Sequence, residues 1–145
     1  VGEQISIRSA KDHVTNVFGM LSRNGKLITY LTPHYIDSDF VIECLNEVAQ
    51  RIERLTVLVI DNAPWHTSKK IDAHIQAWQD KGLFLFRLPT YSPHLNLIEI
   101  LWRKMKYEWL KAEHYLSANA LYEAICNMIR SYDHEFSIEF SKNLF

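Results

Sequence analysis

The chain has 145 residues, of which 48% are hydrophobic and 23% are charged, with four Gly and four Pro. These proportions exclude disordered and collagen-like chains, and the length suits one domain that folds around a single core. Since 16 Lys and Arg stand against 17 Asp and Glu, the net charge predicts no partner, and any contact with nucleic acid must come from a local basic face or from segments outside this chain.

Two further classes are excluded by apolar run length and cysteine spacing. The longest apolar runs, Val57 to Ile60 and Leu83 to Phe86, have four residues each, whereas a bilayer requires roughly 20, so we expect no membrane span and no membrane partner. Cys44 and Cys126 lack the spacing of a metal site. We therefore expect free, buried thiols in a reducing cytoplasm.

The chain is predicted to begin with a β-hairpin. Apolar segments 13–21 and 26–31 flank Asn24-Gly25, a strong hairpin signal because both residues tolerate positive φ. A helix with one apolar face should begin at Asp37 or Ser38, since apolar residues then recur at three- and four-residue steps.

A strand, a helix and a second strand are expected next. Residues 56–60 are apolar without polar alternation, which is typical of a strand covered on both faces, and this strand ends at Asp61. A helix over 68–80 and a strand over 83–88 complete a right-handed parallel crossover. Two more helices are predicted, from Asn96 to about Lys111 and from Ser117 onward. This order indicates an α/β layered domain, in which functional groups collect at the carboxyl ends of the parallel strands.

The stretch VLVIDNAPWH, residues 57–66, contains the first candidate for chemistry. A carboxylate that leaves a buried strand, here Asp61, is held firmly by that strand while the following loop admits water and substrate, so it is well placed to bind a cation. The alternative is that Asp61 and Asn62 form a turn or cap the next helix.

The stretch PTYSPHLNLIEILWRKMK, residues 89–106, contains the second. An apolar helical stripe should bring Glu99, Arg103 and Lys106 to its flank, where Glu99 could bind a metal and the cations could contact phosphate. Two alternatives remain open at this point: a capping box between Asn96 and Glu99, and a solvated ion pair between Glu99 and Arg103.

Together the two stretches resemble the catalytic domain of the DDE transposases of the Tc/mariner superfamily, in particular its bacterial insertion-sequence branch. The similarity covers roughly residues 13–110. It implies a ribonuclease-H-like α/β fold, a mixed sheet with helices on both faces, in which acidic residues bind two divalent cations. By this resemblance Asp61 is the second acid and Glu99 the third.

The resemblance also implies a reaction, cofactors and partners. The family cleaves DNA at the ends of an insertion sequence and transfers the freed strand to target DNA, using two Mg²⁺ or Mn²⁺ ions. Double-stranded DNA, as transposon ends and as target, is the expected partner, in a bacterial cytoplasm at the nucleoid. We expect supporting roles for Asn62, His66 and Asn96, and DNA contacts from Arg103, Lys106, Lys69, Lys70 and Tyr91.

In the family, the first acid lies on a strand before the hairpin. No segment before His13 has the residue pattern expected of that strand. We therefore expect residues 1–145 to be a single catalytic-domain fragment that lacks the first, central strand and the N-terminal helix-turn-helix region, with the first acid upstream of Val1. Asp12, Asp37 and Asp39 are poor substitutes for that acid, and the fragment alone should be inactive.

Without a central strand, the hairpin and the parallel pair would expose backbone edges. Residues 1–10 or a neighbouring chain could pair there, or the sheet could close up and self-associate, so a homo-oligomer formed by strand exchange or edge pairing is expected.

The alternative functions are a non-catalytic remnant that serves in assembly or DNA contact, and a structure-specific nuclease of the same fold. The seven His are scattered without the spacing of a zinc site.

Overall fold

The computed structural model describes residues 2–8, 14–63, 68–90, 92 and 96–132, with side chains from residue 15 onward. The regular elements are β1 (Gly2–Arg8), β2 (Val14–Leu21), β3 (Leu27–Thr32), α1 (Ser38–Arg51), β4 (Thr56–Ile60), α2 (Lys69–Asp80), β5 (Leu83–Arg87), α3 (Ile98–Lys104), a π-helical turn (Met105–Trp109), a 3₁₀ turn (Ala112–Tyr115) and α4 (Ala118–Arg130).

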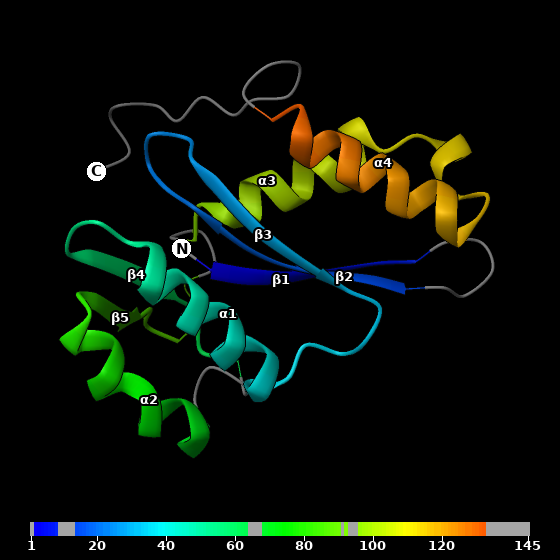
Figure 1. Cartoon of the computed structure of the whole chain (residues 1–145). Coiled ribbons are helices and arrows are strands. Elements are labelled where there is room, and N and C mark those ends of the chain that lie inside the picture. Colours follow the sequence, from blue (N-terminus) through cyan, green and yellow to red (C-terminus); the bar gives the residue numbers. More distant parts are fainter. Residues whose placement is uncertain (1, 9–13, 64–67, 91, 93–95, 133–145) are drawn as a thin grey trace.

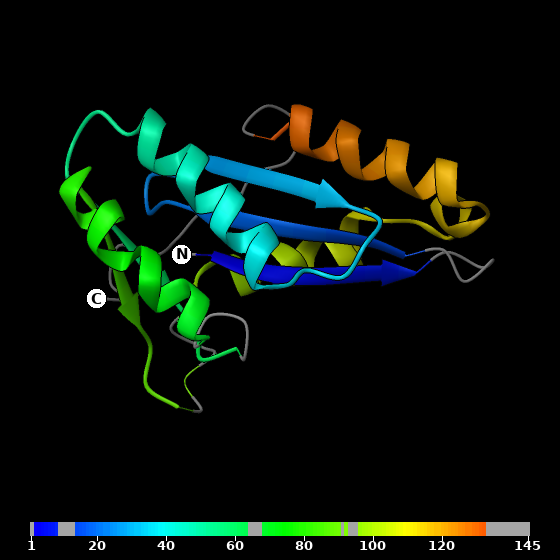
Figure 2. The ribbon, with the colours of Figure 1, turned by 60° about the horizontal axis from the view of Figure 1, so that its bottom comes forward.

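One mixed sheet organises the described residues, with the strand order β3-β2-β1-β4-β5 (Figures 1 and 2). β1, β2 and β3 pair in antiparallel fashion, whereas β1, β4 and β5 run parallel. The predicted hairpin and the predicted parallel pair are therefore both confirmed. None of the helices in the described ranges is long and apolar enough to cross a membrane.

The expectation that no segment before His13 forms a strand is wrong, whereas the alternative that residues 1–10 pair between the hairpin and the parallel pair is confirmed for Gly2–Arg8. Gly2–Arg8 form β1 and occupy the position between the hairpin and the parallel pair. Seven residue pairs join β1 to β2. The segment was missed because Ile5 and Ile7 are its only large apolar residues, and such a short alternation is a weak strand signal until neighbouring strands supply hydrogen-bond partners.

The tight turn between β2 and β3 follows the local sequence. Gly25 has a φ of 87°, a conformation that glycine adopts without steric cost. The Ser22 amide donates to the Lys26 carbonyl over 2.9 Å, which closes the turn. The Asn24-Gly25 signal thus predicted the hairpin correctly, and the structure sets its register, in which Leu21 pairs with Leu27.

Alternation along β2 separates two core clusters on opposite faces of the sheet. Val17 and Leu21 pack with α3, the π-helical turn and α4. Phe18 and Met20 pack with α1, α2, β4 and β5. Helices therefore cover both faces, as Figure 2 shows.

Both cysteines are free thiols. Cys44 is buried in the second cluster, where desolvation raises the pKa of its thiol to about 12. Cys126 is half-buried.

Local capping signals predicted most helix starts correctly. The side chains of Asp37, Ser68 and Ser117 accept hydrogen bonds from the first turns of α1, α2 and α4. The helix predicted from Asn96 to Lys111 is shorter, because α3 begins at Ile98 and passes after Lys104 into the π-helical turn. The Leu110 amide closes that turn by donating to the Met105 carbonyl over 2.9 Å.

Close contact between α3 and β2 depends on Gly19. A Cβ atom at this position would lie 2.5 Å from Trp102 Cζ2 and 3.0 Å from Ile98 Cδ1. Trp102 is buried and its ring is rigid. Only a residue without a side chain lets α3 approach the sheet this closely.

We expect Gly19→Ala to lower the free energy of unfolding by about 1–3 kcal/mol, because the new methyl group overpacks against Trp102. Urea denaturation of the single variants and of Gly19→Ala with Trp102→Leu measures the coupling. Trp102→Leu should cost less in the Gly19→Ala background than alone. Additive effects, or a gain in stability from the higher strand propensity of Ala, would contradict this account.

Candidate active site

Asp61 directly follows β4 and is half-buried. Its Oδ1 accepts a hydrogen bond from the Ala63 amide over 3.1 Å, which is the turn expected of an Asp at the end of a strand. This turn employs one carboxylate oxygen in a weak contact. Asp61 thus has the local role that the alternative interpretation gave it, and this role is compatible with cation binding because a carboxylate offers several acceptor positions.

Asn62 joins the ends of the two parallel strands. Its Nδ2 donates to the Leu88 carbonyl over 2.7 Å, and the Leu88 amide donates to the Ile60 carbonyl, also over 2.7 Å. Both partners of Leu88 flank Asp61 in the sequence. The support of Asp61 therefore includes the residue that follows β5 as well as β4 itself.

Glu99 lies in the first turn of α3 and is half-buried. The proposed capping box is absent, because the cap position is Leu97, which makes no side-chain cap hydrogen bond. Asn96 is 2% exposed, and its backbone carbonyl accepts from the Glu99 amide over 3.1 Å. The buried stripe of Ile98, Leu101, Trp102 and Met105 is as predicted and holds the helix to the sheet.

β1 connects the surroundings of Asp61 with those of Glu99. Gly2 pairs with Ile60 on one side and with Met20 on the other, so the end of β4 and the end of β2 flank the start of β1. Adjacent strands lie about 4.8 Å apart, which separates β4 from β2 by roughly 10 Å at this end. The first turn of α3 lies near the same place (Figures 1 and 2).

The Asp61 position and helix α3 belong to the same face of the sheet. Leu58 and Ile60 point into the cluster with α1 and α2, so alternation along β4 assigns the next position, Asp61, to the opposite face. That face is covered by α3, whose Ile98 approaches Gly19. The end of β4, which Asp61 follows, and the first turn of α3, which contains Glu99, therefore lie at the same end of the sheet (Figures 1 and 2).

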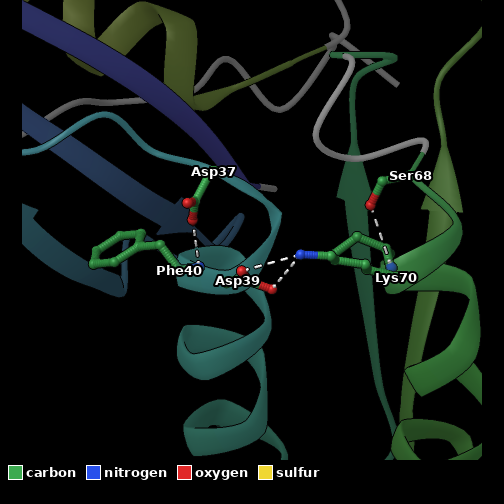
Figure 3. A network of polar contacts seen from close by, with 6 residues as sticks. Asp37, Asp39, Phe40, Ser68 and Lys70 are labelled. Carbon is green, nitrogen blue, oxygen red and sulfur yellow. Dashed lines mark hydrogen bonds and ion pairs between the residues drawn. The ribbon is translucent and has the colours of Figure 1, made fainter.

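The basic residues expected to contact DNA have two different surroundings. Arg103 and Lys106 are exposed on α3 and the π-helical turn, and Lys106 Nζ lies 5.8 Å from the centre of the Tyr107 ring. Lys69 is exposed at the start of α2. Lys70 pairs with Asp39 of α1 at 3.1 Å, and both side chains are largely exposed (Figure 3). A solvent-exposed pair of this kind is weak, so it constrains Lys70 only slightly.

Other carboxylates near the helix starts have structural roles. Asp37 caps α1 through the Phe40 amide, and Asp39 pairs with Lys70 (Figure 3). Glu3 lies outside both acidic motifs, and its backbone lies opposite Gly19 and one residue after the Gly2–Ile60 pair. The alternation of Gln4 and Ser6 with Ile5 and Ile7 is the signal that could have placed it on a strand.

Three predicted positions lie outside the described residues: His66, Tyr91 and Asp12. The histidines that the structure describes have local contacts. His74 stacks on Trp78 with ring centres 5.5 Å apart, and His114 Nδ1 accepts from the Lys111 amide over 3.0 Å. In the described ranges, no three or more His, Cys, Asp or Glu side chains form a group that could hold a metal ion.

The mixed sheet with helices on both faces is a ribonuclease-H-like fold. A chain in the cryo-EM structure of the simian T-cell lymphotropic virus intasome in complex with PP2A regulatory subunit B56 gamma superposes with a TM-score of 0.58 over 95% of this chain, at 14% sequence identity. This chain spans about half of that chain, 49% of its length. At this identity the likeness concerns the fold.

The family follows from the sequence match. The sequence profile described as DDE superfamily endonuclease matches residues 2–122, and the chain belongs to that family. The uncharacterized protein y4pE/y4sA of Sinorhizobium fredii (strain NBRC 101917 / NGR234) is 31% identical over 97 residues, which are 65% of this chain and 67% of that protein.

We expect Asn62→Ala to lower the free energy of unfolding by about 1 kcal/mol, because the Leu88 carbonyl loses its side-chain donor. The urea midpoint measures this loss. Gln76→Ala is the matched control, since it removes the exposed hydrogen bond from Gln76 to Asp80 and should leave the midpoint nearly unchanged. Equal midpoints for Asn62→Ala and the wild type would show that the contact does not support the strand ends.

Proposed function

We propose that this chain is the catalytic domain of a transposase in the bacterial insertion-sequence branch of the Tc/mariner superfamily. In this proposal the protein cleaves DNA strands at the ends of an insertion sequence and joins them to target DNA. The observation that supports it most strongly is that the end of β4, which Asp61 follows, and the first turn of α3, which contains Glu99, lie at the same end of the sheet (Figures 1 and 2) in a chain of the DDE superfamily endonuclease family.

The donor set suits a hard divalent cation. Asp61 and Glu99 are half-buried carboxylates, and Mg²⁺ or Mn²⁺ prefers such oxygen ligands together with retained water. Two bound ions would activate a water or a 3′-hydroxyl for in-line attack at phosphorus and stabilise the leaving oxygen. The chain's own contribution is rigid positioning, since Asn62 and β5 restrain Asp61 while the buried face of α3 restrains Glu99.

The third carboxylate of the proposed site has two possible sources. One is an acid upstream of Val1, on a strand of a longer polypeptide. The other is Glu3, because β1 carries its backbone past the end of β4. We favour the upstream acid and expect residues 1–145 alone to cleave DNA weakly or not at all, because two carboxylates hold a pair of cations less firmly than three.

Substitution of the two acids tests the proposed reaction. In the longer polypeptide, Asp61→Asn and Glu99→Gln should each reduce Mg²⁺- or Mn²⁺-dependent nicking of a plasmid carrying the element's ends by about a hundredfold or more. Asp80→Asn and Glu108→Gln, on exposed carboxylates, are the matched controls and should nick normally. Unchanged nicking in both acid variants would eliminate this site and favour a non-catalytic assembly or DNA-contact module.

Two outcomes refine the assignment. Loss of nicking in Glu3→Gln, with no effect of removing the upstream acids, would identify Glu3 as the third carboxylate. Nicking without joining of ends would favour the second alternative, a structure-specific nuclease of the same fold. A homo-oligomer on paired DNA ends is part of the proposal, since the two ends of an element must be processed together.

DNA is the proposed partner, and the exposed cations along α3 are its proposed contacts. Arg103→Gln together with Lys106→Gln should weaken binding to duplex DNA and lower the slope of log K against log salt by roughly 0.9 for each phosphate that is no longer neutralised. Lys81→Gln, an exposed cation at the far end of α2, is the control. A slope that stays unchanged in the double variant would remove these residues from the proposed DNA interface.

A further inference from the structure

Helix α3 ends in an unusual turn. After its last residue the chain enters the π-helical turn Met105–Trp109, in which the Leu110 amide donates to the Met105 carbonyl over 2.9 Å. In a continuing α-helix the same amide would donate to the Lys106 carbonyl, four residues before it. The turn therefore removes the helical partner of that carbonyl, and single π-helical turns of this kind are frequent at functional sites.

Tyr115 stabilises this turn. Its hydroxyl donates to the Lys106 carbonyl over 3.3 Å, and so replaces the amide that the π-helical turn directs to Met105. Burial, and to a smaller extent the nearby Tyr107, raise the pKa of the Tyr115 hydroxyl, which therefore remains a donor at neutral pH. The π-helical turn is thus supported by a residue outside it, from the 3₁₀ turn Ala112–Tyr115.

The turn exposes an aromatic ring among cations. The Tyr107 side chain is 73% exposed, and Lys106 Nζ lies 5.8 Å from the centre of its ring, a distance at which a cation interacts with an aromatic face. Arg103, one turn earlier, is also exposed. A single exposed aromatic residue carries little information, whereas an exposed ring flanked by exposed cations is the combination that binds single-stranded nucleic acid.

Tyr107 lies about two turns along the helix from Glu99. It follows Glu99 by eight positions, which at 1.5 Å per residue is about 12 Å along the axis. In a regular α-helix these eight positions would rotate Tyr107 by roughly 80° from the line of Glu99. A π-helical turn contains more residues than an α-helical one and reduces this angle. The turn therefore brings Tyr107 nearer to the side of the helix that carries Glu99 and Arg103.

We propose that Tyr107 is the stacking platform for an unpaired DNA base near the phosphate that is cleaved, with Lys106 and Arg103 on the adjoining phosphates. Inside a duplex each face of a base is covered by its neighbours, so the ring binds a base that has left the stack. The distance of about 12 Å corresponds to roughly three or four nucleotides at 3.4 Å each. This inference rests on the proposed function, to which it adds a preference for DNA whose strands are separated beside the cleaved bond.

Binding of residues 1–145 to two synthetic DNAs tests the proposal. One is a blunt duplex, and the other is the same duplex with a single-stranded 3′ overhang; the measured quantity is the ratio of their dissociation constants. Tyr107→Ala should lower the preference for the overhang about fivefold or more, and should leave the affinity for the blunt duplex and its salt slope unchanged. Tyr107→Phe, which keeps the ring, should keep the preference.

A matched control and a cross-link make the test specific. Tyr35→Ala removes a side chain that is 87% exposed and lies outside α3 and the π-helical turn, and it should bind both DNAs as the wild type does. Irradiation of an overhang that contains 5-iodouracil should cross-link this base to Tyr107, as peptide mapping by mass spectrometry would show.

Four results would overturn the inference. The first is an unchanged preference in Tyr107→Ala. The second is a loss in Tyr107→Phe as large as in Tyr107→Ala, which would assign the effect to the hydroxyl. The third is an equal loss for both DNAs with a lower salt slope, which would assign it to the duplex backbone. The fourth, no binding of the wild type to either DNA, would overturn the proposed DNA interface as well, whereas the first three leave that interface intact.

Discussion

The contact between the Trp102 ring and the bare backbone of Gly19 determines where α3 lies. Its strength comes from the absence of a side chain at Gly19, which lets a large aromatic ring reach the sheet and bury its surface there. Because Ile98 reaches the same glycine, the start of the helix is located as well as its middle. Glu99 follows Ile98 directly, so the position of this carboxylate is a consequence of core packing and not of its own contacts.

Asp61 is restrained by different means. Hydrogen bonds from Leu88 to Ile60 and from Asn62 to Leu88 tie the ends of β4 and β5 together on either side of it. The two acids therefore depend on separate supports, a parallel strand pair and a buried helix, which meet at the start of β1. A site supported in this way would keep its geometry through the elements that carry the acids.

β1 joins the hairpin to the parallel strands, but its ladder with β4 is short. Its seven pairs with β2 make it part of the hairpin sheet, while its contact with the parallel half depends on Gly2. The apolar faces of α1 and α2, packed over β2, β4 and β5 in one cluster, carry much of the connection between the two halves. Packing on one face thus compensates for a short ladder in the middle of the sheet.

The sequence by itself determined the local features: the turn at Gly25, the caps at Asp37, Ser68 and Ser117, and the limits of β4. These depend on backbone preferences and hydrogen bonds within a few residues, which a short stretch of sequence encodes. The two acidic motifs could also be recognised from the sequence, because their residue types and order are distinctive.

Only the tertiary structure decided the rest. Gly2–Arg8 became the central strand because neighbouring strands supply its partners, and Asp39 met Lys70, 31 positions away, because α1 and α2 pack side by side. The capping box failed because the packing of Ile98 starts α3 two residues beyond Asn96. The need for glycine at position 19 arises from a ring that approaches from another part of the chain, and such non-local contacts leave no periodic signal in the residues around them.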